Sequence, residues 1–338
     1  GISITLIWCV VQAGTFRLTV QIRVGEQMGL RDRTPPTVEE YLADRERFKN
    51  WDRWGSDDEM GTLNLITDEV RRHAATLANT GRSVSCAYPI ATRPGPRNPT
   101  PAQHFISYGP ANSADYIGLS YHGLVNTHLD ALCHNYTGPG GEMYNGRPSS
   151  LVTTAGAAAN SVDRMRDGIV TRGVLYDIPR LRGTDHVTLD TPIHGWDLED
   201  AAKAQGVEPH AGDAVLIRGS MERFLAAHPE HDRMGAPMPG VHASCLEFLH
   251  EHDASLLGWD MLDASDQGYP GTIPTPDGNL MSWPVHFVAL PFMGMPLLDN
   301  AYLEPLAEAC SDTGCYEFLF MTSPLIILGG TGSPVNPI

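Results

Sequence analysis

The second half of the sequence alternates short apolar runs with segments of helical periodicity, and this pattern restricts the fold more than any other feature. The apolar runs have the length and composition of strands and span residues 168–178, 212–219, 254–260 and 315–327. The helical segments span residues 197–206, 244–253 and 300–310. The chain before residue 168 lacks this alternation, so we expect an α/β domain with a mixed sheet rather than a doubly wound one.

Local signals predict five further segments. Thr37 could cap a helix over residues 38–49, and a second amphipathic helix is predicted over 68–79. Residues 82–90 have the pattern of a strand, and residues 93–103 form a proline-rich loop of the kind that often covers a site. The glycine-rich segment 329–337 follows the last strand and opens no helix, so we expect a tail packed across a neighbour.

The first 27 residues look foreign to the rest of the chain. They start without Met and precede Met28 and a polar, charged segment. Their apolar part, residues 2–11, is too short to span a bilayer and lacks the basic start of a secretory signal. We expect residues 1–27 to be a non-native or disordered extension and residues 28–338 to form one domain. The alternative is a native, poorly ordered arm.

The chain is strongly acidic, and this argues against nucleic acid or an anionic membrane as a partner. Its formal net charge is −17, and the 105 residues after Arg233 contain no Lys or Arg. Carboxylate-rich surroundings suit a divalent cation, although acidity also simply favours solubility. The six cysteines form no CxxC pair, which fits a reducing cytoplasm. No GxGxxG or GxxxxGK[ST] motif follows a strand, so a dinucleotide or P-loop site has no support.

Residues 126–136, NTHLDALCHNY, concentrate groups that can bind a metal or move protons. In a strand, alternate side chains share a face, so His128, Asp130 and His134 could all point one way. Imidazole and carboxylate are both good ligands for divalent metals. An HxD pair alone is a weak signal, because the chain contains 14 histidines.

Three chemistries compete for this motif. In a metal hydrolase, His128 and Asp130 bind the metal and His134 transfers protons for the attacking water. In a non-haem iron oxygenase, His128 and Asp130 would join a distant histidine such as His286, but no basic residue follows His286 to hold a 2-oxo acid. In a thiol enzyme, Cys133 would be the nucleophile with His134 as its base, but neighbours in a strand face opposite sides. The metal hydrolase fits best.

The chain resembles the cyclase family of metal-dependent hydrolases, which includes kynurenine formamidase and isatin hydrolase. The family pattern His-x-Gly-Thr-His-x-Asp-x-Pro-x-His matches residues 124–134 at Thr127, His128, Asp130 and His134. Leu124, Asn126 and Leu132 replace the first histidine, the glycine and the proline. Further segments that resemble the longer branch of this family are WGSDDEMGTLNLIT, MYNGR, GIVTRGVLYDI, GDAVLIR and TGSPVNP.

This resemblance implies a swivelling β/β/α fold, a site that holds zinc or manganese, and a homo-oligomer such as a dimer or tetramer. By position, His128 and Asp130 fall on metal ligands and His134 on the proton-transfer histidine. The segment PVHFVALPFMGMPLLDN places His286 and Asp299 at two further ligand positions, although Asp299 is one methylene shorter than the Glu of the family.

The loss of the first ligand at Leu124 is the main departure from the family pattern. His122 could compensate, or it could be an ordinary histidine of the core or the rim of the site. His242 could line the substrate pocket or merely cap the helix that follows. Of these alternatives, we expect that His122 and His242 contact substrate.

The expected function is hydrolysis of an amide, lactam or ester carbonyl by metal-activated water, with His134 as general acid and base. The alternative is an inactive metal-binding or scaffold relative, because Leu124 cannot bind a metal. Aromatic and Met residues at 51–55, 121–122 and 292–295 would suit a small aromatic substrate, and equally ordinary core packing.

Overall fold

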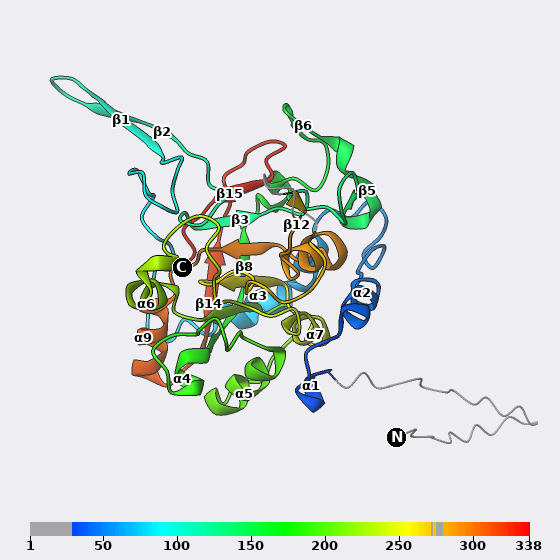
Figure 1. Cartoon of the computed structure of the whole chain (residues 1–338). Helices are drawn as coiled ribbons and strands as arrows, with labels where there is room; N and C mark the ends of the chain where they lie inside the picture. Colours follow the sequence, from blue (N-terminus) through cyan, green and yellow to red (C-terminus); the bar gives the residue numbers. More distant parts are fainter. Residues whose placement is uncertain (1–28, 272, 275–279) are drawn as a thin grey trace, which may run out of the picture.

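The computed structural model describes residues 29–271, 273–274 and 280–338, so the expected extension over residues 1–27 lies outside the described residues. Its centre is a seven-stranded sheet in the order β14-β8-β9-β10-β13-β3-β15 (Figure 1). In that order the strands span Glu317–Thr322, Ile169–Asp177, Ala214–Arg218, Leu256–Trp259, Leu297–Asp299, His128–Asp130 and Gly332–Pro334.

The sheet is mixed, as the sequence predicts. Strands β8, β9, β10 and β13 run parallel, whereas β14, β3 and β15 pair antiparallel with their neighbours. Nearly every residue of β8, β9 and β10 is buried. Burial of both faces is typical of parallel strands covered by helices, and it explains why these segments have continuous apolar runs.

Helices cover this sheet, and their ends follow the expected capping chemistry. The α-helices are α1 Gly29–Asp32, α2 Val38–Arg47, α3 Asp68–Ala75, α4 Ile178–Arg182, α5 Gly195–Gln205, α6 Met221–Ala227, α7 Cys245–Glu251, α8 His286–Val288 and α9 Glu304–Thr313. Thr37 and Glu40 form a reciprocal capping box at the start of α2. Gly206 ends α5 with φ of 69°, a conformation that glycine adopts at little cost.

Short helical turns and ribbons complete the fold. The turns are η1 Gly61–Leu65, η2 Tyr144–Gly146, η3 Ser149–Leu151, η4 Val162–Met165, η5 Pro229–His231 and the π-helical η6 Ala289–Met293. The ribbons pair β1 Gln103–Tyr108 with β2 Ser113–Gly118, β4 Glu142–Met143 with β5 Arg147–Pro148, β6 Val152–Thr153 with β7 Gly156–Ala157, and β11 Ile273–Pro274 with β12 Leu280–Met281. The β1–β2 ribbon projects from the body of the protein (Figure 1).

The predicted tail over 329–337 is wrong, because part of it forms strand β15 of the main sheet. β15 pairs antiparallel with β3, so Gly332, Ser333 and Pro334 lie opposite Asp130, Leu129 and His128. A Cβ on Gly332 would lie 2.6 Å from the carbonyl oxygen of Leu129, so this close pairing requires glycine. The small size of Gly332 therefore lets this segment join the sheet as its edge strand.

Three other predicted elements differ from the structure, one entirely and two in their limits. The strand predicted over 82–90 is wrong, because only an isolated bridge joins Ala87 to Ala301 there. The helix predicted over 68–79 ends at Ala75, and the helix predicted over 300–310 begins only at Glu304. No helix in the described part of the chain is both long enough and apolar enough to cross a bilayer.

Candidate metal centre

Strand β3 carries the first two residues of the candidate centre. It lies between β13 and β15, so His128, Leu129 and Asp130 are completely or almost completely buried. The backbone carbonyl of Asn126 lies 2.8 Å from Nδ1 of His128, which leaves Nε2 directed at the centre. The predicted common orientation of His128 and Asp130 is therefore present in β3.

His134 reaches the same centre through a turn, and not along one face of a strand as predicted. The strand ends at Asp130, and the chain turns so that the amide of His134 donates to the carbonyl of Ala131 at 2.9 Å. This turn places Nε2 of His134 3.8 Å from Oδ2 of Asp130. The imidazole keeps 25% of its side-chain surface exposed, so it lies at the open side of the cluster.

The carboxylate of Asp130 is the point on which the imidazoles converge. Its Oδ1 lies 2.9 Å from Nδ1 of His122 and 3.4 Å from Nε2 of His128. Neither oxygen of Asp130 has a partner with hydrogen-bond geometry among the described residues, and the same holds for Nδ1 of His122. Buried polar atoms without partners are costly, so their lone pairs point to a missing common ligand.

A second carboxylate completes the cluster from strand β13. Oδ2 of Asp299 lies 3.1 Å from Nε2 of His286 and 3.9 Å from Nε2 of His128. The indole N–H of Trp259 donates to the other oxygen of Asp299 at 2.6 Å. His286 in turn donates from Nδ1 to Asp263 at 2.5 Å. Trp259 and Asp263 were not predicted from the sequence, although both lie at or just beyond the end of the buried strand β10.

The carboxylates and imidazoles of the cluster shift one another's pKa values. Burial alone would lower the pKa of His128, but its contacts with Asp130 and the charge of Asp299 raise that pKa to about 9. Burial also opposes protonation of His286, yet Asp299 and Asp263 raise its pKa well above the usual value. Despite its burial, the surrounding histidines hold the pKa of Asp130 well below its usual range. A bound dication would take the place of the protons on these imidazoles.

His134 differs from the other imidazoles in its protonation. Burial lowers its pKa to about 4, although the charge of Asp130 acts in the opposite direction. His134 is therefore neutral near pH 7 and able to accept a proton. Its ring stacks on that of His122 with a centroid distance of 3.9 Å and an angle of 5°.

Known proteins identify the fold in which this centre lies. The family model described as "Putative cyclase" matches residues 39–266, which is more than half of the 338 residues. The chain belongs to the Cyclase family. A crystal structure of a novel cyclase aligns with it at a TM-score of 0.71 and 29% identity, covering 87% of this chain and 97% of that chain.

Two isatin hydrolase structures share the fold. The isatin hydrolase bound to the product analogue thioisatinate has a TM-score of 0.52 and 18% identity, covering 80% of this chain and 97% of that chain. Isatin hydrolase A from Ralstonia solanacearum has a TM-score of 0.52 and 22% identity, covering 79% and 94%. No curated protein matches the chain in sequence. The predicted α/β mixed-sheet fold of the Cyclase family is confirmed.

Leu124, which stands where the Cyclase pattern has its first histidine, does not belong to the metal-binding cluster. It lines a cavity of about 190 Å³ whose other walls include Tyr88, Met221 and Leu225. None of the residues that line this cavity belongs to the two groups of possible ligands, His122/Asp130/His134 and His128/Asp130/Asp299. Leu124 therefore faces this cavity, whose walls also include Arg97, Glu222 and Asp260, and not the metal-binding cluster.

The structure does not bring His242 into the cluster. Its ring lies against those of His194 and Tyr269, at centroid distances of 4.5 and 5.7 Å. The amide of Ser244 donates to Nδ1 of His242 at 3.0 Å. The predicted contact of His242 with substrate stays a prediction.

The thiol alternative has little support in the geometry. Cys133 is completely buried, and burial raises the pKa of its thiol to about 12. The thiol contacts the carbonyl of Gly330 at 3.8 Å. A buried, protonated thiol is a poor nucleophile near pH 7.

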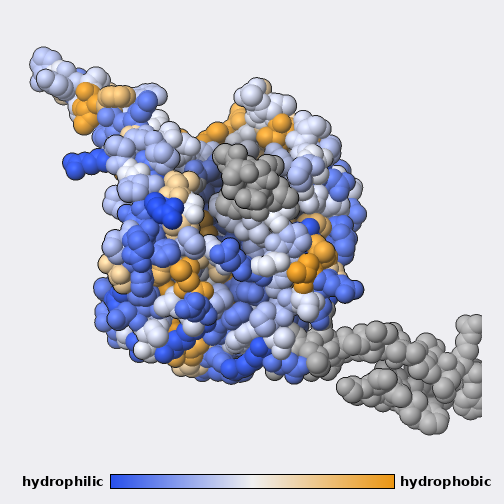
Figure 2. Space-filling view, in the orientation of Figure 1, coloured by the Kyte–Doolittle hydropathy of each residue, from blue (hydrophilic) through white to orange (hydrophobic). Residues whose placement is uncertain are grey.

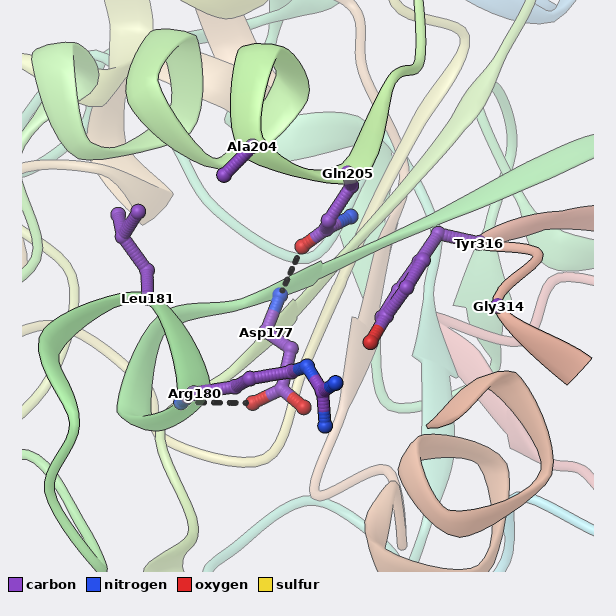
Figure 3. Close-up of a pocket in the computed structure, with 7 residues that line it drawn as sticks. All are labelled: Asp177, Arg180, Leu181, Ala204, Gln205, Gly314 and Tyr316. Atoms are coloured by element: carbon purple, nitrogen blue, oxygen red, sulfur yellow. Dashed lines mark hydrogen bonds between the residues drawn. The ribbon is translucent and has the colours of Figure 1, made fainter. Parts of the chain in front are cut away.

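A cavity of about 370 Å³ lies elsewhere, at the end of β8 (Figure 3). Its polar groups already serve one another: Gln205 accepts from the amide of Asp177 at 3.1 Å, and Asp177 accepts from the amide of Arg180 at 3.3 Å. None of the predicted site residues lines this cavity. We therefore place the functional site at Asp130 rather than here.

Proposed function

We propose that this protein is a metal-dependent hydrolase that cleaves the carbonyl C–N or C–O bond of an amide, lactam or ester. The observation that carries this proposal is the carboxylate of Asp130, which is fully buried and has three imidazoles directed at it. Neither of its oxygens has a hydrogen-bond partner in the part of the chain that the structure describes. Such an arrangement is unfavourable without a cation and favourable with one.

The residues present fit Zn²⁺ or Mn²⁺. His128, Asp130, His286 and Asp299 would hold the metal, because their nitrogen and oxygen donors are the ligand types that these ions accept. Asp263 and Trp259 would orient His286 and Asp299 through their hydrogen bonds. A bound metal would supply a Lewis acid for the carbonyl and would lower the pKa of water toward about 7.

His134 would move the proton in this reaction. As a neutral imidazole it accepts a proton from the attacking water at Nε2 and returns it to the leaving nitrogen or oxygen. Its partly exposed side chain lets it contact substrate, whereas His128 and His286 are almost completely buried. General acid–base catalysis of this kind contributes about 10²–10⁴ in rate.

Half-buried aromatic side chains flank the cluster and favour a small aromatic substrate. Trp283 lies against His286 at a centroid distance of 4.9 Å, and Tyr121 lies against His122 at 4.7 Å. The related isatin hydrolase binds thioisatinate, a small aromatic analogue of its product. By analogy, an aromatic lactam or formamide would place its ring between these side chains and its carbonyl at the metal.

We further propose that the enzyme is cytoplasmic. The five cysteines in the described part of the chain are free, which fits a reducing cytoplasm. We also propose that the protein is a homo-oligomer, for which the exposed β1–β2 ribbon provides a surface.

A panel of formamides, cyclic imides, lactams and lactones, assayed with added Zn²⁺ or Mn²⁺, tests the activity. We expect metal-dependent hydrolysis of at least one aromatic member, with loss of that activity in Asp130→Asn. The absence of turnover in the metal-loaded wild type would favour the alternative that Leu124 suggests, an inactive relative that retained the fold.

A further inference from the structure

We infer that His122 supplies the metal-binding imidazole that the Cyclase pattern has at Leu124; this inference rests on the proposed metal centre. Two donors bound to one ion at about 2.1 Å lie about 3.0 Å apart at right angles and about 3.4 Å apart in a tetrahedron. Oδ1 of Asp130 lies 2.9 Å from Nδ1 of His122 and 3.4 Å from Nε2 of His128, so each imidazole has the spacing of a donor that shares an ion with Asp130. The two imidazoles fall in different groups of close donor atoms, His122 with Asp130 and His134, and His128 with Asp130 and Asp299.

The orientation of the two groups supports a shared ion rather than a hydrogen bond. At 2.9 Å a hydrogen bond between Nδ1 of His122 and Oδ1 of Asp130 would be expected, yet neither atom has a partner of acceptable geometry among the described residues. Donors that share an ion each direct a lone pair at the ion and not at the other donor. This explains a short contact between two atoms that remain without hydrogen bonds.

The contacts of His122 hold its imidazole in an orientation that leaves Nδ1 available to a metal. Nε2 lies 3.1 Å from the hydroxyl of Thr331, in the segment that precedes β15. A hydrogen bond at Nε2 leaves Nδ1 free to bind a metal, which is how partners of ligand histidines generally act. Gly123 follows with φ of 143°, so the chain bends between His122 and Leu124 and the two side chains leave in different directions.

Metal affinity of single variants tests this inference. The dissociation constant of Zn²⁺ would be measured by competition with a chromophoric chelator in wild type, His122→Ala, Leu124→Ala and the surface control His73→Ala. We expect His122→Ala to weaken binding by at least about tenfold. We expect Leu124→Ala and His73→Ala to bind as the wild type does. The absorption spectrum of the Co²⁺-loaded protein should change only in His122→Ala.

The outcomes separate this inference from the proposed function. If the wild type binds Zn²⁺ and His122→Ala binds it equally well, with an unchanged Co²⁺ spectrum, the role of His122 is wrong while the proposed function stands. If the wild type itself binds no metal, the proposed function fails. Circular dichroism in the presence of a chelator shows whether His122→Ala is folded, which is expected because His122 is only half-buried.

We propose, from an independent observation, that the β1–β2 ribbon is an arm that docks on a second copy of this chain. Every residue of β1 is exposed, and the ribbon projects from the body with apolar residues along it (Figures 1 and 2). The large apolar side chains exposed on it are Phe105, Ile106, Tyr108, Tyr116 and Ile117. An isolated two-stranded ribbon is at best marginally stable in water, so a partner surface is needed.

The arm is apolar on both faces. Packing one face against its own body would therefore leave the other apolar face exposed to water. Phe105 and Tyr116 are cross-strand partners and stack on one face at 6.0 Å. Ile106 and Tyr108 alternate with Phe105 and lie on the other face, where Tyr108 is 88% exposed. Such an arm suits insertion into a partner.

A matching surface lies on the loop between β14 and β15. Leu325, Ile326 and Leu328 are exposed there, Leu328 to 75%, and no charged residue occurs between 321 and 338. The charged side chain on the arm, Asp115, is paired with His104 at 2.6 Å. Two copies of a chain with a net charge of −17 repel each other, so uncharged surfaces are where they can meet.

The area is sufficient for a stable dimer. Large apolar side chains that are half to fully exposed offer on the order of 100 Å² each, so arm and loop together offer roughly 800 Å² per copy. This is about what each partner contributes to a standard interface. If each arm docks on the loop of the other copy, the contact is symmetric and closed. The loop continues into Thr331, so the docked arm would border the metal centre.

Molar mass in solution tests the arm. We expect light scattering at about 50 μM protein to give twice the chain mass of 36.8 kDa, or a multiple of that dimer mass. Phe105→Asp with Tyr108→Asp, and separately Leu328→Asp, should lower the mass to that of the monomer, whereas Val38→Asp on α2 should not. A monomeric wild type, or arm variants that remain associated, would overturn the proposal. Zn²⁺ binding by the variants shows that they are folded.

Discussion

Asp263 holds His286 in one tautomer and one orientation. Its Oδ2 accepts the Nδ1–H of His286 at 2.5 Å, and its Oδ1 accepts the amide of Val285 at 2.6 Å. Nε2 of His286 is thereby turned to Asp299, 3.1 Å away. When a metal displaces the proton from Nε2, this hydrogen bond keeps the other proton on Nδ1, so Nε2 offers the lone pair that a metal requires.

Asp263→Asn should therefore weaken metal binding without removing a ligand. The amide is a poorer acceptor for Nδ1–H and can also present a donor to it, so His286 loses its fixed tautomer. We expect the dissociation constant of Zn²⁺, measured by calorimetry, to rise by about 10- to 100-fold. Glu308→Gln, at an exposed position on α9, serves as the control. Equal affinities of Asp263→Asn and wild type would contradict the orienting role.

His134→Ala should separate catalysis from metal binding. The side chain is placed to transfer protons, and its removal should lower kcat by about 10²–10⁴ while the metal content stays that of the wild type. Elemental analysis and a steady-state assay on the same preparation measure both quantities. Loss of the metal from His134→Ala would show that this residue is a ligand and that our assignment of its role is wrong.

Arg218→Met should strongly destabilise the fold far from the metal. Arg218 donates to the buried carboxylate of Asp177 at 2.6 Å and pairs with Glu304 at 2.9 Å. Among the described residues, its removal leaves the buried carboxylate of Asp177 without a cation and leaves Glu304 with only the half-exposed Arg223 at 3.4 Å, which costs about 3–5 kcal/mol of unfolding free energy. Arg71→Met, which breaks an exposed pair with Asp68, should cost less than about 1 kcal/mol. Urea denaturation of the metal-free proteins compares the two, and similar losses would contradict the prediction.

His194 should make the fold sensitive to acid. Burial lowers its pKa from the usual 6.5 to about 4 in the folded protein. As the pH falls below 6.5, the unfolded chain takes up a proton that the folded protein does not, so stability is lost until the pH reaches about 4. His194→Gln should therefore lose less stability than the wild type between pH 6.5 and 4. Urea midpoints at several pH values test this, with the exposed His73→Gln as control. Parallel curves for His194→Gln and wild type would count against it.

Much of the fold could be predicted because local and global signals agree. The buried strands β8, β9 and β10 have continuous apolar runs, and Thr37 and Gly206 mark helix ends that the structure confirms. Strand β15 was missed because its pairing with β3 depends on the small size of Gly332, which apolar periodicity does not report.

The site was predictable only in part, because sequence spacing does not show how a chain bends. His128 and Asp130 follow from strand alternation, and the resemblance to the Cyclase family pointed to His286 and Asp299. The approach of His122 to Asp130 depends on the bend at Gly123, which brings together residues eight positions apart. The exposed arm also has ordinary strand propensity, and only the fold shows that the described residues of its own chain leave it exposed.

Metal content tests the central claim most directly. Protein purified without chelator would be analysed for zinc and manganese beside His128→Ala and Asp130→Ala, with His73→Ala as the folded control. We predict about one or more ions per chain in the wild type and the control, and their loss from both cluster variants. A wild type that takes up no metal, even after incubation with Zn²⁺ and Mn²⁺, would contradict the metal-dependent account.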